Sequence, residues 1–209
     1  MSDLEIEVKF FLPDPESIRE RLGVLGTEPA SEPVFERNLR FENAAGDLRR
    51  QQALLRLRQD RSARLTYKGP PGAAGAGLEG AVKVFRELEV SVSDFDRTRA
   101  ILEAVGFSVV QSYEKWRQTF AIDGAECCLD ILPYGTFLEI EGPAATIRSV
   151  SRRLELPWER RILTNYLALF ETVREAFDLP FSDLTFAHFE GKPVDAAPVI
   201  RGFEAGEDP

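Results

Sequence analysis

The stretch LEIEVKF, residues 4–10, alternates apolar and charged side chains at every position. Such alternation is typical of a β-strand, because successive side chains point to opposite faces of a sheet. One face is therefore apolar, and the other carries Glu5, Glu7 and Lys9. On a strand with one face in water, these charged side chains would simply be solvated. The direction in which this charged face points decides what kind of fold the chain has.

The same alternation returns in several later segments, and the sign of the charge changes between them. The charged or polar positions are Arg56 and Arg58, Thr66 and Lys68, Glu87 and Glu89, Lys115 and Arg117, Asp130, and Glu139 and Glu141. Two arrangements fit this pattern. Either the apolar faces pack into a conventional core with the charges outside, or the sheet closes into a barrel whose interior is charged and whose apolar exterior is covered by helices.

Four segments have the pattern of helices that could cover such a barrel: 15–25, 93–105, 146–156 and 164–177. Pro15 stands at the first position of the first helix, while Ser93 is the expected cap of the second and Gly106 its end. Apolar side chains of the fourth segment, among them Phe170 and Val173, fall on one helical stripe. Residues 69–80 are rich in Gly, Ala and Pro, which predicts a flexible loop.

The composition is that of a single globular domain, with 209 residues, 44% hydrophobic and 29% charged. A net charge of −9 argues against nucleic-acid or anionic-membrane binding through bulk electrostatics, although it permits a local basic site. We see no signal peptide and no membrane-spanning segment. The two cysteines, Cys127 and Cys128, are adjacent and would point in opposite directions, so we expect no disulfide framework and a cytoplasmic protein. The oligomeric state, monomer or homodimer, stays open.

Six charged motifs together resemble the CYTH superfamily, also called the triphosphate tunnel metalloenzymes. These are ExExK at 5–9, RxR at 56–58, KG at 68–69, ExE at 87–89, KxR at 115–117 and GTFLEIEG at 135–142. The resemblance runs from Leu4 to about Gly142 and is weaker in the helix that contains TNYLALF. It implies an α+β fold, mainly antiparallel β, in which eight strands close into a barrel tunnel that binds a triphosphate with a divalent metal. The charged faces would then point inward.

The residue types suit this chemistry. Guanidinium and ammonium groups form strong charge-assisted hydrogen bonds with phosphate oxygens, whereas Mg²⁺ takes one or two carboxylates together with phosphate and water. The expected substrate-binding residues are Lys9, Arg56, Arg58, Lys68, Lys115 and Arg117. The expected ligands of Mg²⁺ or Mn²⁺ are Glu5, Glu7, Glu139 and Glu141, with Glu87, Glu89 and Asp130 at a second site or orienting the ligands. Lys9, Lys68 and Asp130 are the candidate catalytic residues.

Several functions are compatible with such a tunnel. The first is hydrolysis of inorganic triphosphate or a nucleoside triphosphate, and the second is the class IV adenylyl cyclase reaction. The cyclases of the superfamily have a His-Phe pair before ExExK, and here only Met-Ser-Asp precedes Leu4. A thiamine triphosphatase would have an aromatic residue at the inward position occupied by Leu54. Outside enzymology, a polyphosphate-binding module would not need the carboxylates, and a lipocalin-like carrier would need an apolar interior.

The remaining expectations concern individual residues and the C-terminus. Trp116 should point outward beneath a helix, and the single histidine, His188, and both cysteines should be structural. Asn38 and Arg40 share one strand face and could help to hold the ligand. We divide the chain into a tunnel domain, 1–187, and a tail, 188–209. The tail should be dispensable for folding, although Val199, Ile200 and Phe203 are apolar enough to dock.

Overall fold

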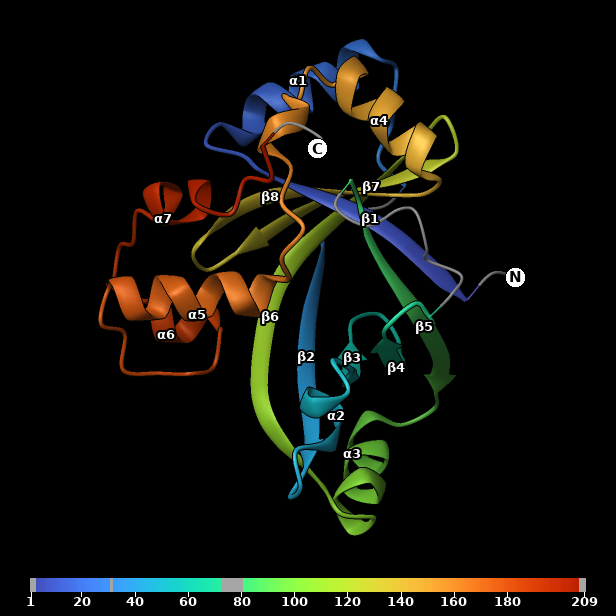
Figure 1. Cartoon of the computed structure of the whole chain (residues 1–209), viewed down its shortest axis with the longest axis vertical. Coiled ribbons are helices and arrows are strands. Elements are labelled where there is room, and N and C mark those ends of the chain that lie inside the picture. Colours follow the sequence, from blue (N-terminus) through green and yellow to red (C-terminus); the bar gives the residue numbers. More distant parts are fainter. Residues whose placement is uncertain (1–2, 31, 73–80, 207–209) are drawn as a thin grey trace.

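The computed structural model describes residues 3–30, 32–72 and 81–206. Eight antiparallel strands form a closed barrel in the order β1-β5-β4-β3-β2-β6-β7-β8 (Figure 1). They are β1 (Leu4–Phe11), β2 (Val34–Asn43), β3 (Leu54–Gln59), β4 (Ala63–Gly69), β5 (Lys83–Val92), β6 (Phe107–Ile122), β7 (Ala125–Leu132) and β8 (Gly135–Glu141). The predicted eight-stranded barrel is therefore confirmed. Most of the predicted 69–80 loop, residues 73–80, lies outside the described ranges.

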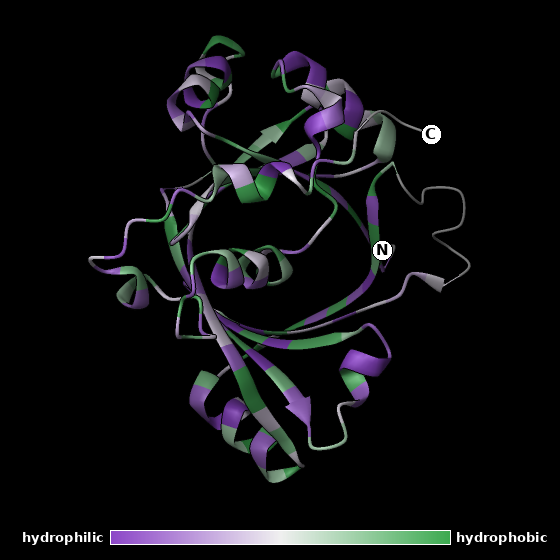
Figure 2. Ribbon diagram, turned by 60° about the vertical axis from the view of Figure 1, so that its left-hand side comes forward, coloured by the Kyte–Doolittle hydropathy of each residue, from purple (hydrophilic) through white to green (hydrophobic). Residues whose placement is uncertain are grey.

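The first strand closes the barrel. On one side of β1, Glu7 stands opposite Lys83 of β5, and on the other side it stands opposite Glu141 of β8. Because β1 has a partner on each side, the sheet has no free edge there. The side chains that the sequence places on the charged face consequently point into the barrel, and the apolar side chains between them point out. Figure 2 shows this alternation of hydrophilic and hydrophobic residues along the strands.

Helices cover the apolar exterior. The helices are α1 (Pro15–Val24), α2 (Asp47–Arg50), α3 (Phe95–Ala104), α4 (Ala144–Arg153), α5 (Tyr166–Ala176), α6 (Phe186–Phe189) and α7 (Ala197–Arg201), with a 3₁₀ turn at Trp158–Arg160. The four long predicted helices are all present. Asp94 rather than Ser93 caps α3, since its carboxylate accepts a hydrogen bond from the backbone N–H of Arg97. The sequence did not predict the short helices α2, α6 and α7.

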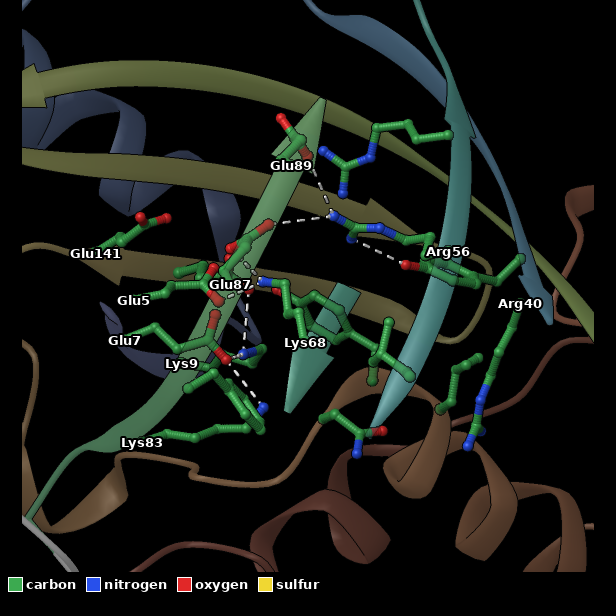
Figure 3. A pocket seen from close by; sticks show the side chains of 18 of the residues that line it. Glu5, Glu7, Lys9, Arg40, Arg56, Lys68, Lys83, Glu87, Glu89 and Glu141 are labelled. Carbon is green, nitrogen blue, oxygen red and sulfur yellow. Dashed lines mark hydrogen bonds and ion pairs between the residues drawn. The ribbon is translucent and has the colours of Figure 1, made fainter. Parts of the chain in front are cut away.

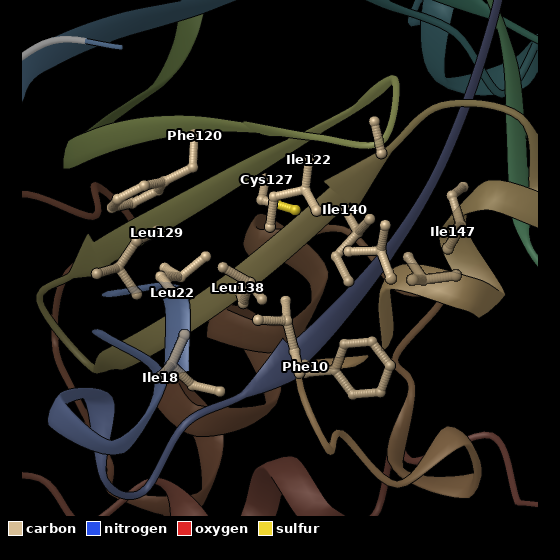
Figure 4. Close-up of a cluster of buried hydrophobic side chains, with 14 of the residues drawn as sticks. Phe10, Ile18, Leu22, Phe120, Ile122, Cys127, Leu129, Leu138, Ile140 and Ile147 are labelled. Carbon is tan, nitrogen blue, oxygen red and sulfur yellow. The ribbon is translucent and has the colours of Figure 1, made fainter. Parts of the chain in front are cut away.

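The largest apolar cluster lies outside the barrel, between β1, β7 and β8 and the two helices α1 and α4. Figure 4 shows Phe10 and Leu138 of the sheet facing Ile18 of α1 and Ile147 of α4. Each of these side chains is buried. A second cluster joins α3 to β2 and β3 around Phe41. The core of this protein is therefore a shell around the barrel, which leaves the interior free for polar side chains.

The C-terminal segment packs against this shell. Ile200 of α7 is completely buried in a cluster with the apolar side of α5, and Val199 and Phe203 pack beside it. The buried guanidinium of Arg161 donates a hydrogen bond to the carbonyl of Gly206 at 2.8 Å. The apolar tail residues thus dock, and the division at residue 187 remains a prediction. No helix in the described ranges has both the length and the apolar character needed to cross a membrane.

Candidate functional site

The inward faces of the strands enclose a cavity of about 610 Å³, within the roughly 300–1,000 Å³ typical of small-molecule sites. Every predicted site residue except Asp130 lines it (Figure 3). These residues are Glu5, Glu7, Lys9, Arg56, Arg58, Lys68, Glu87, Glu89, Lys115, Arg117, Glu139 and Glu141. The prediction that the charged faces converge on one interior space is confirmed for these residues, whereas Asp130, which it included, does not line the cavity. The chemical role of each residue stays a prediction.

A second hollow lies beside this cavity, at the turn between β3 and β4. This smaller space has a volume of about 300 Å³ and is lined in part by Asp60 and Ser62 of the turn. Arg58, Arg117 and Glu126 line both spaces, so the two are adjacent. Charged side chains therefore line both spaces along the barrel interior.

Carboxylates hold the basic side chains of β1 and β4. The ammonium group of Lys9 lies 2.5 Å from Glu7 and 3.2 Å from Glu139. Lys68 forms an ion pair with Glu5 and a second with Glu87, the latter at 3.1 Å. Figure 3 shows Lys9 beside Glu7, and Lys68 close to Glu5 and Glu87. The acidic residues therefore hold these two ammonium groups inside the cavity.

A second group of basic residues surrounds Glu36. This glutamate was not among the predicted site residues. The Glu36 carboxylate lies 3.0 Å from the guanidinium of Arg58 and 3.6 Å from the ammonium of Lys115. Burial would raise the pKa of Glu36, but Lys115 and Arg58 outweigh it and lower this pKa to about 2. Asn38 and Arg40 of β2, which were expected to help hold the ligand, also lie near this group. Asn38 accepts a hydrogen bond from Arg58 at 3.0 Å. The other, Arg40, lines the cavity.

Asp130 differs from the other predicted site residues because it points to the interior but is covered by Lys115 and Arg117 and does not line the cavity. It is completely buried, and its oxygens accept hydrogen bonds from Lys115 at 2.8 Å and from Arg117 at 2.6 and 2.7 Å. The hydroxyl of Tyr166, from the first turn of α5, donates a further bond at 2.9 Å. With its oxygens occupied in this way, Asp130 is placed to orient the two basic side chains. This geometry favours the orienting role over direct metal ligation.

A row of carboxylates crosses three neighbouring strands. Glu7 of β1 is opposite Glu141 of β8, which in turn is opposite Glu126 of β7. Among the described residues, no Lys or Arg lies within ion-pair distance of Glu141. Burial, together with the neighbouring Glu139, raises the pKa of Glu141 to about 7. Burial and the Glu7 charge likewise raise the pKa of Glu5, to about 8, despite its contact with Lys68.

Glu7 behaves in the opposite way. Burial and the neighbouring Glu139 would raise its pKa, but Lys9 and Lys83 outweigh both and lower it to about 2. The row therefore combines an ionised Glu7 with a Glu141 that lacks a compensating cation. Like charges in a buried site are unfavourable unless a cation joins them.

This donor set fits a divalent metal ion that also binds phosphate. Within the described ranges, no three His, Cys, Asp or Glu side chains converge into a complete protein cage. Mg²⁺ does not need such a cage, because it usually retains water and takes one or two carboxylates plus substrate phosphates. Glu7 and Glu141 could supply those carboxylates, and the excess negative charge beside Glu141 would favour the ion.

The sequence contained a signal for some of the cavity residues that were missed. Glu36, which lines the smaller space, continues the alternation of Asn38 and Arg40. Tyr113, which lines the cavity, continues that of Lys115 and Arg117. Lys83 and Phe85 also line the cavity and extend the inward positions of Glu87 and Glu89 along β5. Tyr166 had no such signal. It is the first residue of α5, which begins more than twenty residues after the last strand ends.

The other predicted residues have structural surroundings. His188 stacks on Phe181 with ring centroids 4.8 Å apart and contacts the carbonyl of Asp183 at 3.0 Å. Both thiols are free and buried, Cys127 within the shell core. Trp116 points outward as expected, but it remains 42% exposed and packs on Phe35 instead of lying beneath a helix. The expectation of a covering helix at Trp116 was wrong, because no long helix packs on this part of β6.

The comparisons with known proteins agree with this geometry. The model of the CYTH domain family matches residues 3–158, which is well over half of the chain. The chain belongs to the CYTH family. A protein of Methanocaldococcus jannaschii named "Putative adenylate cyclase MJ0240" is 28% identical to this CYTH protein over 154 residues, or 73% of this chain and 84% of that one.

Solved structures show the same fold. A "putative adenylate cyclase" from Vibrio parahaemolyticus matches 82% of this chain and 99% of its own length, with a TM-score of 0.72 and 18% identity. HpAC1 from Hippeastrum, described as a "putative adenylyl cyclase" with a dominant triphosphatase activity, matches 80% of this chain and 95% of its own length. Its TM-score is 0.55 and its identity 20%. At these identities the two structures establish the fold that the CYTH protein shares with them.

Proposed function

We propose that this CYTH protein hydrolyses a triphosphate inside the barrel, with Mg²⁺ or Mn²⁺ bound by the interior carboxylates. The observation that carries the proposal is the composition of the cavity wall, where basic side chains from several strands face a row of carboxylates that lacks cations at Glu141. A triphosphate–metal complex has the complementary charges. Neither an apolar ligand nor a polyanion without metal would suit both halves of this wall.

The basic residues would hold the phosphates and stabilise the charge that develops on transfer. The proposed phosphate ligands are Lys9, Arg56, Arg58, Lys68, Lys115 and Arg117. A water molecule would attack the terminal phosphorus, and the bond to the bridging oxygen would break, so that a diphosphate and a phosphate leave. Donors that already point at the developing charge lower the barrier without reorganisation. Lys9 and Lys68, held extended by carboxylates, are the candidates for that contact.

The carboxylates would hold the metal. One or two of Glu5, Glu7, Glu139 and Glu141 are the proposed ligands, and Glu87, Glu89 and Asp130 would orient ligands or the basic groups. The bound ion would supply Lewis-acid neutralisation of the phosphate charge. The position of Asp130 behind Lys115 and Arg117 supports its orienting role.

The test is a phosphate-release assay on purified protein with inorganic triphosphate, ATP and thiamine triphosphate, each with Mg²⁺, Mn²⁺ or EDTA. Glu141→Gln removes the charge that has no ion-pair partner, so we expect a folded variant with little activity at ordinary metal concentrations. Glu20→Gln, on the exposed side of α1, is the matched control and should retain full activity. Metal-independent turnover by folded Glu141→Gln would contradict the proposal.

A second candidate is the adenylyl cyclase reaction. It is supported by the printed names of the Methanocaldococcus and Vibrio relatives, whereas the triphosphatase activity described for the Hippeastrum protein supports hydrolysis. In a cyclase the ribose 3′-hydroxyl attacks the α-phosphorus, and diphosphate leaves. Measuring cyclic AMP and diphosphate in the same ATP reactions separates the two. Cyclic AMP formed in proportion to the ATP consumed would replace hydrolysis as the assigned function.

A further inference from the structure

Three buried tyrosines in or beside the barrel interior differ in what their hydroxyl protons do. The hydroxyl of Tyr166 donates to Asp130, and that of Tyr134 donates to the carbonyl of Tyr166, both at 2.9 Å. The hydroxyl of Tyr113, which lines the cavity, only accepts a hydrogen bond, from the guanidinium of Arg56 at 3.3 Å. Among the residues that the structure describes, no acceptor takes its proton. Tyr113 therefore keeps an unused O–H donor inside the barrel.

The charges around Tyr113 are those of the basic wall. Burial would raise the pKa of its phenol, but Arg56 and Arg58 of β3 and Lys115 of its own strand outweigh burial and lower this pKa. In the other two tyrosines, burial and the charge of Asp130 raise the pKa well above its usual value. Of the three phenols, only that of Tyr113 is made more acidic by its surroundings.

The neighbouring side chains include further donors without acceptors. Asn38 of β2 stands opposite Tyr113, whereas Glu36, a carboxylate on the same face of β2, stands opposite Lys115. Asn38 is completely buried, and in the described part of the chain its amide nitrogen has no hydrogen-bond partner. The Nε atom of Arg56 is buried without one as well. Because buried donors are normally satisfied, these groups indicate a place that the oxygen atoms of a ligand fill.

We propose that Tyr113 is a catalytic residue, the proton donor to the group that leaves when a bound triphosphate is cleaved, a proposal that rests on the proposed function. The attacking water bonds to the terminal phosphorus and loses a proton to the solvent. The bond from this phosphorus to the bridging oxygen breaks, and that oxygen takes the electron pair and the proton of Tyr113, so that diphosphate leaves. The surrounding cations stabilise the phenolate, which regains a proton from the solvent.

Other groups of the cavity wall suit this step less well. Carboxylate partners outweigh burial and raise the pKa of both Lys9 and Lys68, so these ammonium groups hold their protons more firmly. Arginine does not release its proton in proteins. Glu5 and Glu141 are candidates for the metal. A general acid works best when its pKa lies near the working pH, and the cations around Tyr113 shift its pKa in that direction.

The experiment measures kcat and KM for inorganic triphosphate and for ATP with Mg²⁺ over a range of alkaline pH. Tyr113→Phe keeps the ring but removes the proton, so we expect kcat to fall about hundredfold while KM changes less than about threefold. Wild-type kcat should fall as the pH rises through the pKa of Tyr113, and the residual activity of the variant should lack this decrease. Tyr67→Phe, the same change on the outer face of β4, is the control and should alter neither constant.

A second variant separates proton donation from a structural role. Difluorotyrosine incorporated at position 113 keeps the hydroxyl and nearly the same shape but is a stronger acid. If Tyr113 donates the proton, the alkaline decrease in kcat should move to lower pH in this protein. A hydroxyl that merely holds Arg56 would leave the decrease where it is. An unmoved decrease, or a kcat of Tyr113→Phe within about twofold of wild type, would overturn the proposal.

Failure of the proposed function has a different signature. If the wild type forms cyclic AMP, diphosphate is still the leaving group, and the same variants test Tyr113 with ATP. If no triphosphate is turned over at all, binding provides the test. The fluorine NMR signal of difluorotyrosine at position 113 should then shift when tripolyphosphate is added, and should not shift with sodium chloride of equal ionic strength. A signal that ignores tripolyphosphate would refute the contact.

Discussion

The hydroxyl of Tyr166 donates a hydrogen bond of 2.9 Å to Oδ2 of Asp130, the carboxylate that also binds Lys115 and Arg117. The same tyrosine ring lies 5.3 Å from the Lys115 ammonium and 5.1 Å from that of Lys9. A helix outside the barrel therefore reaches the basic wall of the cavity through the Tyr166 side chain. This contact makes α5 part of the site and gives a first prediction.

Tyr166→Phe should weaken turnover more than it weakens the fold. The variant keeps the ring and its contacts with the two lysines but removes the hydroxyl, so we expect a loss of about 1 kcal/mol in the free energy of unfolding. Asp130 would reorient Lys115 and Arg117, and we expect kcat/KM to fall by about tenfold, or ~1.4 kcal/mol. Kinetics and urea denaturation on the same preparation measure both. Tyr67→Phe, on the outer face of β4, is the control. A kcat/KM equal to wild type in the Tyr166 variant would refute the link.

Glu36→Gln should destabilise the protein strongly. The change leaves the size of the side chain intact but deprives buried Arg58 and Lys115 of a negative charge at 3.0 and 3.6 Å. Removing one partner of a buried ion pair typically costs about 3–5 kcal/mol. Denaturant unfolding at neutral pH gives the loss directly, with exposed Glu20→Gln for comparison. A difference below about 1 kcal/mol between the two variants would be inconsistent with this arrangement.

The stability of the metal-free protein should fall as the pH rises through about 7. The folded pKa values of Glu141 and Glu5, about 7 and 8, lie above the ordinary carboxyl value, so the folded state holds more protons than the unfolded state in this range. Their favourable contribution is complete below the unfolded pKa and is lost on deprotonation. Tm measured in EDTA should decrease from about pH 5 to about pH 8, and less so in Glu141→Gln.

At low pH the dependence should reverse, so that the stability of the protein falls as the pH falls. The pKa values of Glu7 and Glu36 are lowered to about 2, so the stability they provide is present above the unfolded carboxyl pKa and is lost as the pH falls toward 2. Metal provides the complementary test at the alkaline end, because Mg²⁺ should raise Tm more at about pH 8 than at about pH 5. An equal Mg²⁺ effect at both pH values, or none, would argue against carboxylate-bound metal.

Ile200→Ala should lower the free energy of unfolding by about 2–5 kcal/mol, since its side chain is completely buried against the α5 cluster. Truncation after Ala187 should lower Tm further, because it also removes the buried Ala196. Val24→Ala, whose side chain is 87% exposed, serves as the control. The sequence favoured a dispensable tail because the barrel strands and their covering helices are complete before it. An unchanged Tm after truncation would restore that interpretation.

The barrel could be predicted because its information is local and repeated. ExExK at 5–9 and KxR at 115–117 show alternation within a few residues, and alternation determines which face each side chain joins. Asp130 follows the same alternation and does point to the interior side. What alternation cannot show is the depth along the barrel, and for that reason it did not distinguish Asp130 from the residues that line the cavity.

The remaining parts depend on contacts between distant segments. Nothing near Tyr166 indicates that the start of its helix enters the barrel, and the lone apolar residues Leu54, Phe85 and Leu167 have no common sequence pattern. Their proximity follows from strand register and from the Lys9–Ile162 pairing, which only the folded chain shows. The docking of Ile200 is of the same kind.

The closure of the barrel by β1 also constrains how the protein assembles. The strand made first pairs with β5 and with the last strand, β8, so the row from Glu7 to Glu141 joins the two ends of the barrel sequence. Contacts of such large sequence separation form slowly, because a long loop must close before they bring any gain. During synthesis, the interior lysines and glutamates of a partial chain remain in water until β8 has left the ribosome. The cavity therefore cannot be complete before β8 has been made, and no shorter fragment of the barrel would contain it.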